Sequence, residues 1–166
     1  MSPRSKGLLI VGGAAALAAG LVPMSGAMAA DPVGNNGTVK IDGVAFDTAP
    51  DNQPHVGCNF QVDWYGFDAG AINSHVTFEA QPPTGRGILL QDDVNVGEDA
   101  AGGGTDLDFE KVYNLTGPLL GGGYKPHPIQ GYHVMLTINT DGAQGADVKH
   151  KVFWVQACDS GSGGSN

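Results

Sequence analysis

Residues 55–67 have the sequence HVGCNFQVDWYGF, and this stretch decides how the chain is expected to fold. Apolar side chains recur at every second position: Val56, Cys58, Phe60, Val62 and Trp64, with polar Asn59, Gln61 and Asp63 between them. A period of two is typical of a β-strand with one face in a core and the other in water. The stretch therefore predicts a half-buried strand that holds central aromatic residues and one of the chain's 2 cysteines.

The N-terminal segment, residues 1–29, has the pattern of a secretory signal peptide. Arg4 and Lys6 precede a short apolar run, and small residues suited to signal peptidase end at Ala29. A membrane anchor is the weaker interpretation, because the run is short and a cleavage site follows it. We therefore expect a secreted protein, extracellular or associated with the cell surface, with no membrane span in its mature form.

The rest of the chain divides where its composition changes. Residues 30–37 are polar with Pro and Gly and are expected to form a flexible leader. Residues 159–166 are rich in Gly and Ser and are expected to form a solvated tail. Between them, residues 38–158 are long enough for one domain with its own core.

The charge balance is strongly acidic. The chain contains 17 acidic and 8 basic residues, and loss of Arg4 and Lys6 with the signal peptide changes the formal net charge from −9 to −11. Such a surface repels phosphate backbones, so nucleic acid is not an expected partner. Many secreted proteins are acidic, so the negative charge argues against nucleic acid as a partner but does not indicate which partner the protein has.

The cysteines, Cys58 and Cys158, are expected to form one disulfide, because exported proteins keep such bonds. The bridge would close almost the whole domain. In the chain-entropy model a loop of this length contributes roughly 4–5 kcal/mol, as an upper figure. The alternatives are a catalytic cysteine or a metal thiolate, and the sequence shows neither a CxxC spacing nor a Cys/His cluster for them.

About seven segments have the character of strands, and turn signals separate them. They cover residues 38–46, 55–67, 72–80, 88–96, 107–115, 132–139 and 149–158. Residues 117–130 contain three prolines and four glycines, so no regular structure is expected there. The pattern predicts an all-β fold, an immunoglobulin-like β-sandwich of about seven strands with one disulfide.

Several runs resemble a family of uncharacterised secreted proteins of actinobacteria with an immunoglobulin-like fold. They are HVGCNFQVDWYGFD, VTFEAQPPTG, GGGTDLD, QGYHVMLTIN and DVKHKVFWVQAC, within a region from about Gly37 to Cys158. Many members of that family continue into a linker and an anchoring tail, whereas this chain ends at Asn166 without a sorting motif or an apolar tail. The resemblance implies a secreted location and brings no activity and no site residues.

Metal sites have weak support in the sequence. Six acidic residues of neighbouring segments are a weak calcium candidate: Asp92, Asp93, Glu98, Asp99, Asp106 and Asp108. Calcium requires oxygen ligands, but the spacing matches no EF-hand, and a solvated acidic rim is the favoured interpretation. The five histidines form no HxH or HExxH motif, and His75 and His133 fall at outward positions of strands. We therefore expect no metal and no cofactor.

Four apolar side chains are candidates for a contact surface. Tyr65 and Phe67 fall on the solvent parity of their strand, and Phe153 and Val155 fall on the outer parity if Val152, Trp154 and Cys158 face the core. Exposed aromatic residues on a sandwich form a plausible contact surface. The alternative, to which we give equal weight, is that the N-terminal segment or the loop 117–130 covers these four side chains.

These observations predict a non-catalytic module that binds a cell-envelope component or another protein, or that has a structural role. The alternative is a secreted enzyme, metal-dependent (Ca or Zn) or carbohydrate-active. The chain has no Gly-x-Ser-x-Gly motif, and no pair of carboxylates stands out among its many acidic residues.

Overall fold

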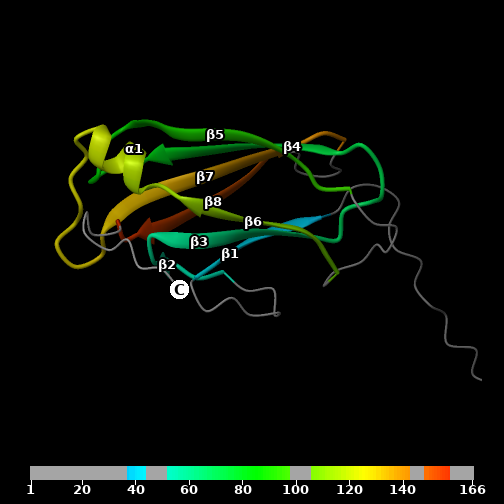
Figure 1. Cartoon of the computed structure of the whole chain (residues 1–166), viewed down its shortest axis with the longest axis horizontal. Coiled ribbons are helices and arrows are strands. Elements are labelled where there is room, and N and C mark those ends of the chain that lie inside the picture. The colour runs from blue at the N-terminus through cyan, green and yellow to red at the C-terminus, as the bar shows by residue number, and fades with distance from the viewer. Residues whose placement is uncertain (1–36, 44–51, 98–105, 143–147, 158–166) are drawn as a thin grey trace, which may run out of the picture. The chain divides into compact units, whose positions relative to one another are not determined.

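In the part of the chain that the structure describes, eight strands and one short helix follow one another (Figure 1). They are β1 (Thr38–Asp42), β2 (His55–Val56), β3 (Asn59–Tyr65), β4 (Asn73–Ala80), β5 (Gly87–Asn95), β6 (Leu107–Asn114), α1 (Thr116–Gly121), β7 (Tyr132–Thr140) and β8 (Val148–Val155). The computed structural model describes residues 37–43, 52–97, 106–142 and 148–157, which lie within one unit of residues 31–166. Each expected segment contains a strand, so the predicted all-β class is confirmed.

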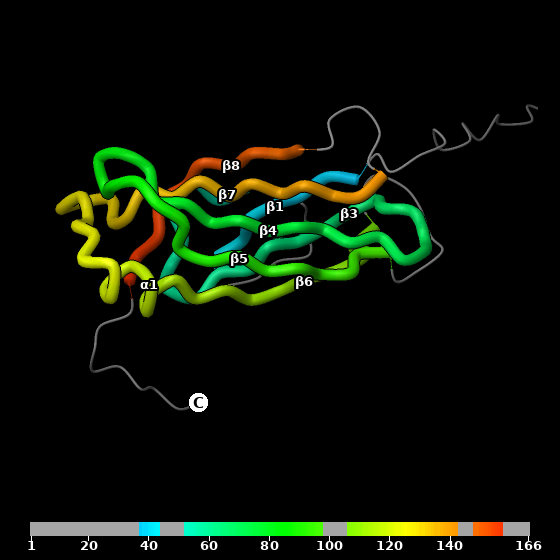
Figure 2. The backbone as a smooth tube through the Cα atoms, turned by 90° about the horizontal axis from the view of Figure 1, so that it is seen from above, coloured from blue at the N-terminus to red at the C-terminus, as the bar shows by residue number. Residues whose placement is uncertain are grey.

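The strands form two sheets that face each other, as Figure 2 shows from above. One sheet has the order β1-β3-β6 and the other the order β2-β8-β7-β4-β5. Neighbouring strands are antiparallel except β2 and β8, which run parallel. This arrangement is an all-β sandwich with the core between its sheets.

Aromatic rings at the centre of the core connect the sheets. The Phe60 ring of β3 lies 5.7 Å from that of Phe78 and 5.3 Å from that of Phe153, both in edge-to-face geometry. Trp64, also on β3, is fully buried, and its Nε1 donates to Ser74 Oγ at 3.1 Å. The predicted core face of this strand, Phe60, Val62 and Trp64, is confirmed.

The other face of β3 is also buried beyond the exposed Asn59, so the prediction of a strand with one face in water is wrong for most of its length. Gln61, Asp63 and Tyr65 are all buried. The cause is the position of β3 between β1 and β6, because side chains of both neighbouring strands flank each of its residues. Gln61 Nε2, for example, donates to Glu110 Oε2 at 3.0 Å.

The predicted strand 55–67 is interrupted at Gly57 and Cys58. The short β2 pairs with β8 in one sheet, whereas β3 pairs with β1 and β6 in the other. The chain crosses between the sheets at these two residues, and Cys58 is half-buried there. The prediction that Cys58 lies on the core face of a continuous strand is therefore wrong.

The predicted orientation of the last strand is also wrong. Phe153 and Val155 are buried in the core, whereas Val152 is 54% exposed and Trp154 is only partly buried. The register explains this, because Phe153 pairs with Val134, a core residue of β7, and Trp154 pairs with His133 on the outer face. Both parities of this strand are apolar, so alternation alone did not determine which one faces inward.

The expectation of no regular structure in residues 117–130 is wrong at the start of that region. The helix α1 forms at Thr116–Gly121 and packs Leu119 into the core. Pro118 is tolerated because the first turn of a helix has backbone N–H groups without intrahelical partners.

No helix in the described part of the chain is long and apolar enough to cross a membrane.

Candidate binding surface

All five histidines lie on or beside the outer face of the five-stranded sheet, around Trp154 or further along it. We call this surface the histidine face: His55, His75, His127, His133 and His150, with Trp154. The register of β7 against β8 explains this surface. His133 pairs with Trp154 and Thr137 pairs with His150, and all four residues alternate along their strands with residues that point toward the other sheet. The outward positions predicted for His75 and His133 are confirmed by their pairing opposite Asp93 and Trp154.

Three of these histidine rings surround the Trp154 ring. His133 stacks on it with a centroid distance of 4.4 Å and an interplanar angle of 24°, and His55 lies at 6.5 Å and 9°. Because β8 lies between β2 and β7, the two imidazoles flank the indole from opposite sides. His127 contacts the same indole at 5.8 Å.

The loop before β7 places His127 beside the indole. His127 and Gly131 exchange two backbone hydrogen bonds, of 2.7 and 3.0 Å, which close a tight turn. Gly131 has a φ of 88° and lies against the carbonyl oxygen of Val155, where a Cβ would clash. Glycine is therefore required at this position, and it brings the turn against the end of β8.

Hydrogen bonds hold the three rings in place. His133 Nδ1 donates to the carbonyl oxygen of Pro82 at 2.7 Å. His127 Nδ1 accepts from the backbone N–H groups of Ile129 and Gln130, each at 3.3 Å. His55 Nε2 lies 3.4 Å from Gln130 Oε1. The stacked rings thus form a fixed surface.

A second polar group lies around His75, near the other end of the face. His75 Nδ1 lies 2.5 Å from Asp93 Oδ1, and its Nε2 lies 3.8 Å from Asp141 Oδ1. The hydrogen bond to Asp93 and the charge of Asp93 raise the pKa of His75, desolvation lowers it, and the charge of Asp141 raises it by the smallest amount. An open pocket of about 390 Å³ borders this pair and is lined by His75, Val76, Thr77, Gln91, Asp92 and Asp93.

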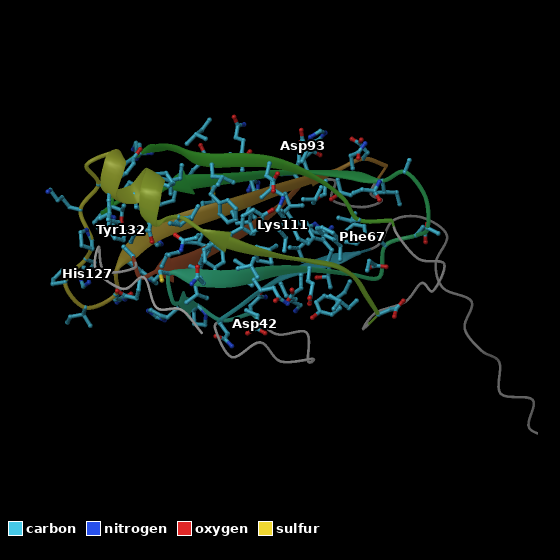
Figure 3. All side chains as sticks on the ribbon, in the orientation of Figure 1. Asp42, Phe67, Asp93, Lys111, His127 and Tyr132 are labelled. Atoms are coloured by element: carbon cyan, nitrogen blue, oxygen red, sulfur yellow. The ribbon has the colours of Figure 1, made fainter. Side chains whose placement is uncertain are left out.

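Of the described residues in the calcium candidate, Asp92, Asp93 and Asp108 each have a different partner; Figure 3 labels Asp93 and Lys111, the partner of Asp92. Asp92 and Asp93 are adjacent in β5, so they point to opposite sides of the sheet: Asp92 accepts from Lys111 and Tyr113, and Asp93 contacts His75. Asp108 Oδ2 accepts from the backbone N–H of Phe67. Asp106 lies at the start of β6, and Glu98 and Asp99 lie outside the described residues. Within the described residues, no group of three or more His, Cys, Asp or Glu side chains is arranged to hold a metal ion.

The contact surface predicted at Tyr65, Phe67, Phe153 and Val155 is wrong, because all four side chains are buried. Phe153 and Val155 belong to the core between the sheets. The Phe67 ring lies directly against Gly37, in the segment just before β1. The alternative of cover by the N-terminal segment or the loop 117–130 is not needed for Phe153 and Val155, because both face the core.

Sequence reasoning missed Trp154, the residue at the centre of the histidine face. The missing signal was the register of β7 against β8, since His133 was correctly predicted to point outward and Trp154 is its cross-strand neighbour.

Comparisons with protein-family models, with curated proteins and with solved structures find no match to this chain.

Proposed function

We propose that this chain is an exported, non-catalytic β-sandwich module that binds a cell-envelope component or another protein through its histidine face. The observation behind this proposal is the contrast between the two tryptophans. Trp64 is fully buried with its N–H bonded to Ser74, whereas Trp154 lies on the outer face of its sheet and is only partly buried. No acceptor for the Trp154 Nε1–H is found in the described part of the chain.

The outer-face position of Trp154 leaves part of its side chain in contact with solvent, which is unfavourable for an isolated domain. A tryptophan side chain buries a large area and contributes strongly where it is covered. Tryptophan with a free N–H is also typical of the central contacts of binding sites. His133 stacks on one face of the indole at 4.4 Å, and His55 lies parallel to the indole at 6.5 Å, so a partner meets imidazole nitrogen atoms together with the indole.

Further apolar side chains enlarge this surface. Val152 and Met135 form the next cross-strand pair along β8 and β7, and Val148 lies beyond them. Val148 and Val152 are both exposed. A mixture of exposed apolar and polar side chains on one sheet suits an interface with a partner.

The order of the strands supports an immunoglobulin-like sandwich as the finer fold assignment. If β1, β3, β4, β5, β6, β7 and β8 are labelled A, B, C, C′, E, F and G, the sheets become A-B-E and G-F-C-C′. These are the strand neighbours of immunoglobulin domains of the variable type. Modules of that type commonly serve recognition, although the fold alone assigns no function.

The disulfide between Cys58 and Cys158 is part of this proposal. Cys158 lies outside the described residues, and no free thiol is found among the described ones. The parallel pairing of Val56 with Val155 continues in a hydrogen bond from Gln156 N to the oxygen of Val56 at 3.1 Å. This pairing places Val56, two residues before Cys58, beside Val155, three residues before Cys158, which supports the bridge.

The test is retention of the mature protein on cell-envelope material. Trp154→Ala should abolish or strongly reduce retention. Val112→Ser is the matched control, because Val112 is 53% exposed but belongs to β6 of the other sheet. Equal retention of both variants and the wild type would contradict the proposal.

The alternative, a metal-dependent or carbohydrate-active enzyme, is favoured by one feature, the pocket at the His75–Asp93 pair. A histidine beside a carboxylate is a common general base. Both side chains are largely exposed, however, so their surroundings provide little of the desolvation that active sites use. Hydrolysis of a glycan substrate that is lost in a His75→Gln variant would favour the enzyme.

A further inference from the structure

The outer face of the five-stranded sheet carries few charged side chains. Val76, Phe78 and Leu136 of β4 and β7 point into the core, so the residues that alternate with them point outward with their cross-strand partners on β5 and β8. Among the outward residues of these four strands, only Glu79 and Asp93 are acidic, and none is a Lys or Arg. This face is therefore close to neutral in a chain whose formal net charge is −9.

The strand register arranges the outward residues in rows that cross the sheet. One row, from β8 to β5, consists of hydrogen-bonding side chains without a formal charge: His150, Thr137, Thr77 and Gln91. The next row, which we call the apolar row, is apolar apart from one carboxylate: Val152, Met135, Glu79 and Ile88. Beyond it lies the row of aromatic rings: Trp154, His133 and His55. The apolar row thus lies between two rows of hydrogen-bonding groups.

The hydrogen bonds of the histidine face determine which ring nitrogens remain for a partner. A backbone carbonyl only accepts, so His133 Nδ1 carries the proton in its bond to Pro82, and Nε2 of the neutral ring is an acceptor. His127 is the reverse case, because its Nδ1 accepts from two backbone N–H groups and its Nε2–H is therefore a donor. The Nε1–H of Trp154 is a second donor. Within the residues that the structure describes, none of these three ring nitrogens has a hydrogen-bond partner.

The three nitrogens belong to rings that lie close together. The ring centroids of His133 and His127 lie 4.4 and 5.8 Å from that of Trp154. A hydroxyl group accepts from an N–H and also donates to a ring nitrogen, so neighbouring hydroxyl groups match two donors and one acceptor. An ionised phosphate or carboxylate only accepts, and it would leave Nε2 of His133 without a partner.

Two other classes of partner fit this face less well. An anionic polymer needs basic side chains, which the outward positions of these strands lack, and it meets a chain of negative net charge. A folded protein is commonly bound by an apolar centre with a polar rim, whereas here apolar and polar rows alternate across the sheet. A sugar ring has apolar C–H faces and hydroxyl groups at its edge, so it matches an apolar row between two hydrogen-bonding rows.

We infer that the histidine face binds a neutral polysaccharide of the cell envelope. Its hydroxyl groups bond to the ring nitrogens of Trp154, His127 and His133, and its C–H faces lie on the apolar row. Thr77 and Gln91 line the open pocket of about 390 Å³, so the surface along which the polysaccharide lies is hollowed there. This inference rests on the proposed function, because it names the partner of the same face.

The first experiment identifies the class of partner. Envelope material is treated with periodate, which cleaves the vicinal diols of sugars, with protease, or with neither, and retention of the purified protein is measured on each. We expect periodate to abolish retention and protease to leave it unchanged. Loss after protease alone would identify a protein partner and overturn this inference, while the proposed function would stand. Absence of retention on untreated material would contradict the proposed function itself, and this inference with it.

The second experiment tests the acceptor nitrogen of His133. Polysaccharide released from the same material is separated by anion exchange into a neutral and an acidic fraction, and each is titrated into the protein by calorimetry. His133→Phe keeps a ring against Trp154 but removes Nε2, and it should weaken binding of the neutral fraction about tenfold. His133→Gln supplies an amide acceptor on a side chain of similar length and should recover part of the affinity. Val112→Ser, on the other sheet, should bind as the wild type does.

Three results of the titrations would overturn the inference. The first is binding of the acidic fraction alone, and the second is the absence of binding to both fractions. The third is equal affinity of His133→Phe and the wild type for the neutral fraction. Thermal denaturation of each variant shows that a loss of binding is not a loss of the fold.

Discussion

The Nζ atom of Lys111 lies 2.5 Å from Oδ2 of Asp92, across the gap between the two sheets. Lys111 is on β6 and Asp92 on β5, and Tyr113 donates a second hydrogen bond to the same oxygen at 2.9 Å. In the sequence both residues interrupt otherwise apolar positions. The structure explains why both charged residues occur at these positions: they form an ion pair that closes one edge of the sandwich.

This pair predicts a pH-dependent contribution to stability. Desolvation raises the pKa of Asp92, but the hydrogen bonds from Lys111 and Tyr113 outweigh it, so the pKa lies below its ordinary value. The stabilisation is therefore present above the unfolded-state pKa of Asp and is lost as the pH falls through the lower folded-state pKa. Asp92→Asn should lower the free energy of unfolding by about 1 kcal/mol at pH 7. Urea denaturation should show this difference shrinking at low pH, and a difference that stays constant with pH would contradict it.

Phe153 is expected to be essential for stability. It is 2% exposed and contacts Phe60 and Phe78, so Phe153→Ser should lower the free energy of unfolding by about 3–5 kcal/mol. The adjacent Val152 is 54% exposed, so Val152→Ser should change it by less than about 0.5 kcal/mol. Thermal or urea denaturation measures both. If the two substitutions had equal effects, the assignment of Phe153 to the inward face of β8 and of Val152 to its outer face would be contradicted.

The turn at Gly131 should control the position of His127. Alanine at this position has an unfavourable φ and a clash with the oxygen of Val155. Gly131→Ala should therefore displace the turn, with a loss of about 1 kcal/mol or more in stability. In NMR spectra the His127 ring signals should lose the ring-current shift caused by Trp154. His127 shifts that match the wild type would show that the turn does not need glycine.

The His75–Asp93 pair predicts a measurable titration shift. Asp93 is the main cause of the raised pKa of His75, and Asp141 is a smaller one. In an NMR titration, Asp93→Asn should lower the His75 pKa clearly and Asp141→Asn only slightly. A raised folded-state pKa stabilises below the unfolded-state value, and this contribution disappears as the pH rises through the folded-state value. A larger effect of Asp141→Asn than of Asp93→Asn would contradict the geometry.

The proposed disulfide needs a direct measurement on the purified protein, kept free of reductant. Intact mass after alkylation without reductant should show no modified thiol, because Cys58 and Cys158 are expected to be bonded. Reduction should destabilise the fold by roughly 4–5 kcal/mol at most. Two alkylated thiols in the unreduced protein would disprove the bridge.

The sequence was sufficient where one face of a strand is apolar and the other polar. In β4 and β7 the predicted inward residues, such as Phe78 and Leu136, are buried as expected. The sequence was insufficient in β8, because both faces of this strand carry apolar side chains. The face that shares its parity with Cys158 was predicted to point into the core. The sequence also failed for Gln61 and Asp63, because burial of polar side chains depends on the neighbouring strands β1 and β6, which alternation within one strand does not reveal.

The candidate surface was only partly predictable for the same reason. Outward positions of His75 and His133 follow from their own strands. Their gathering with His55, His127 and Trp154 depends on the parallel pairing of β2 with β8 and on the turn before β7. Long-range pairing of this kind has no local signal in the sequence.

The central claim is that Trp154 contacts the partner, and acrylamide quenching of tryptophan fluorescence tests it most directly. The chain has 2 tryptophans and Trp64 is fully buried, so the quencher should reach Trp154 almost alone. We predict that protein bound to cell-envelope material is quenched much less than free protein. Bound protein with unchanged quenching would contradict the claim, because Trp154 would then remain open to solvent in the complex.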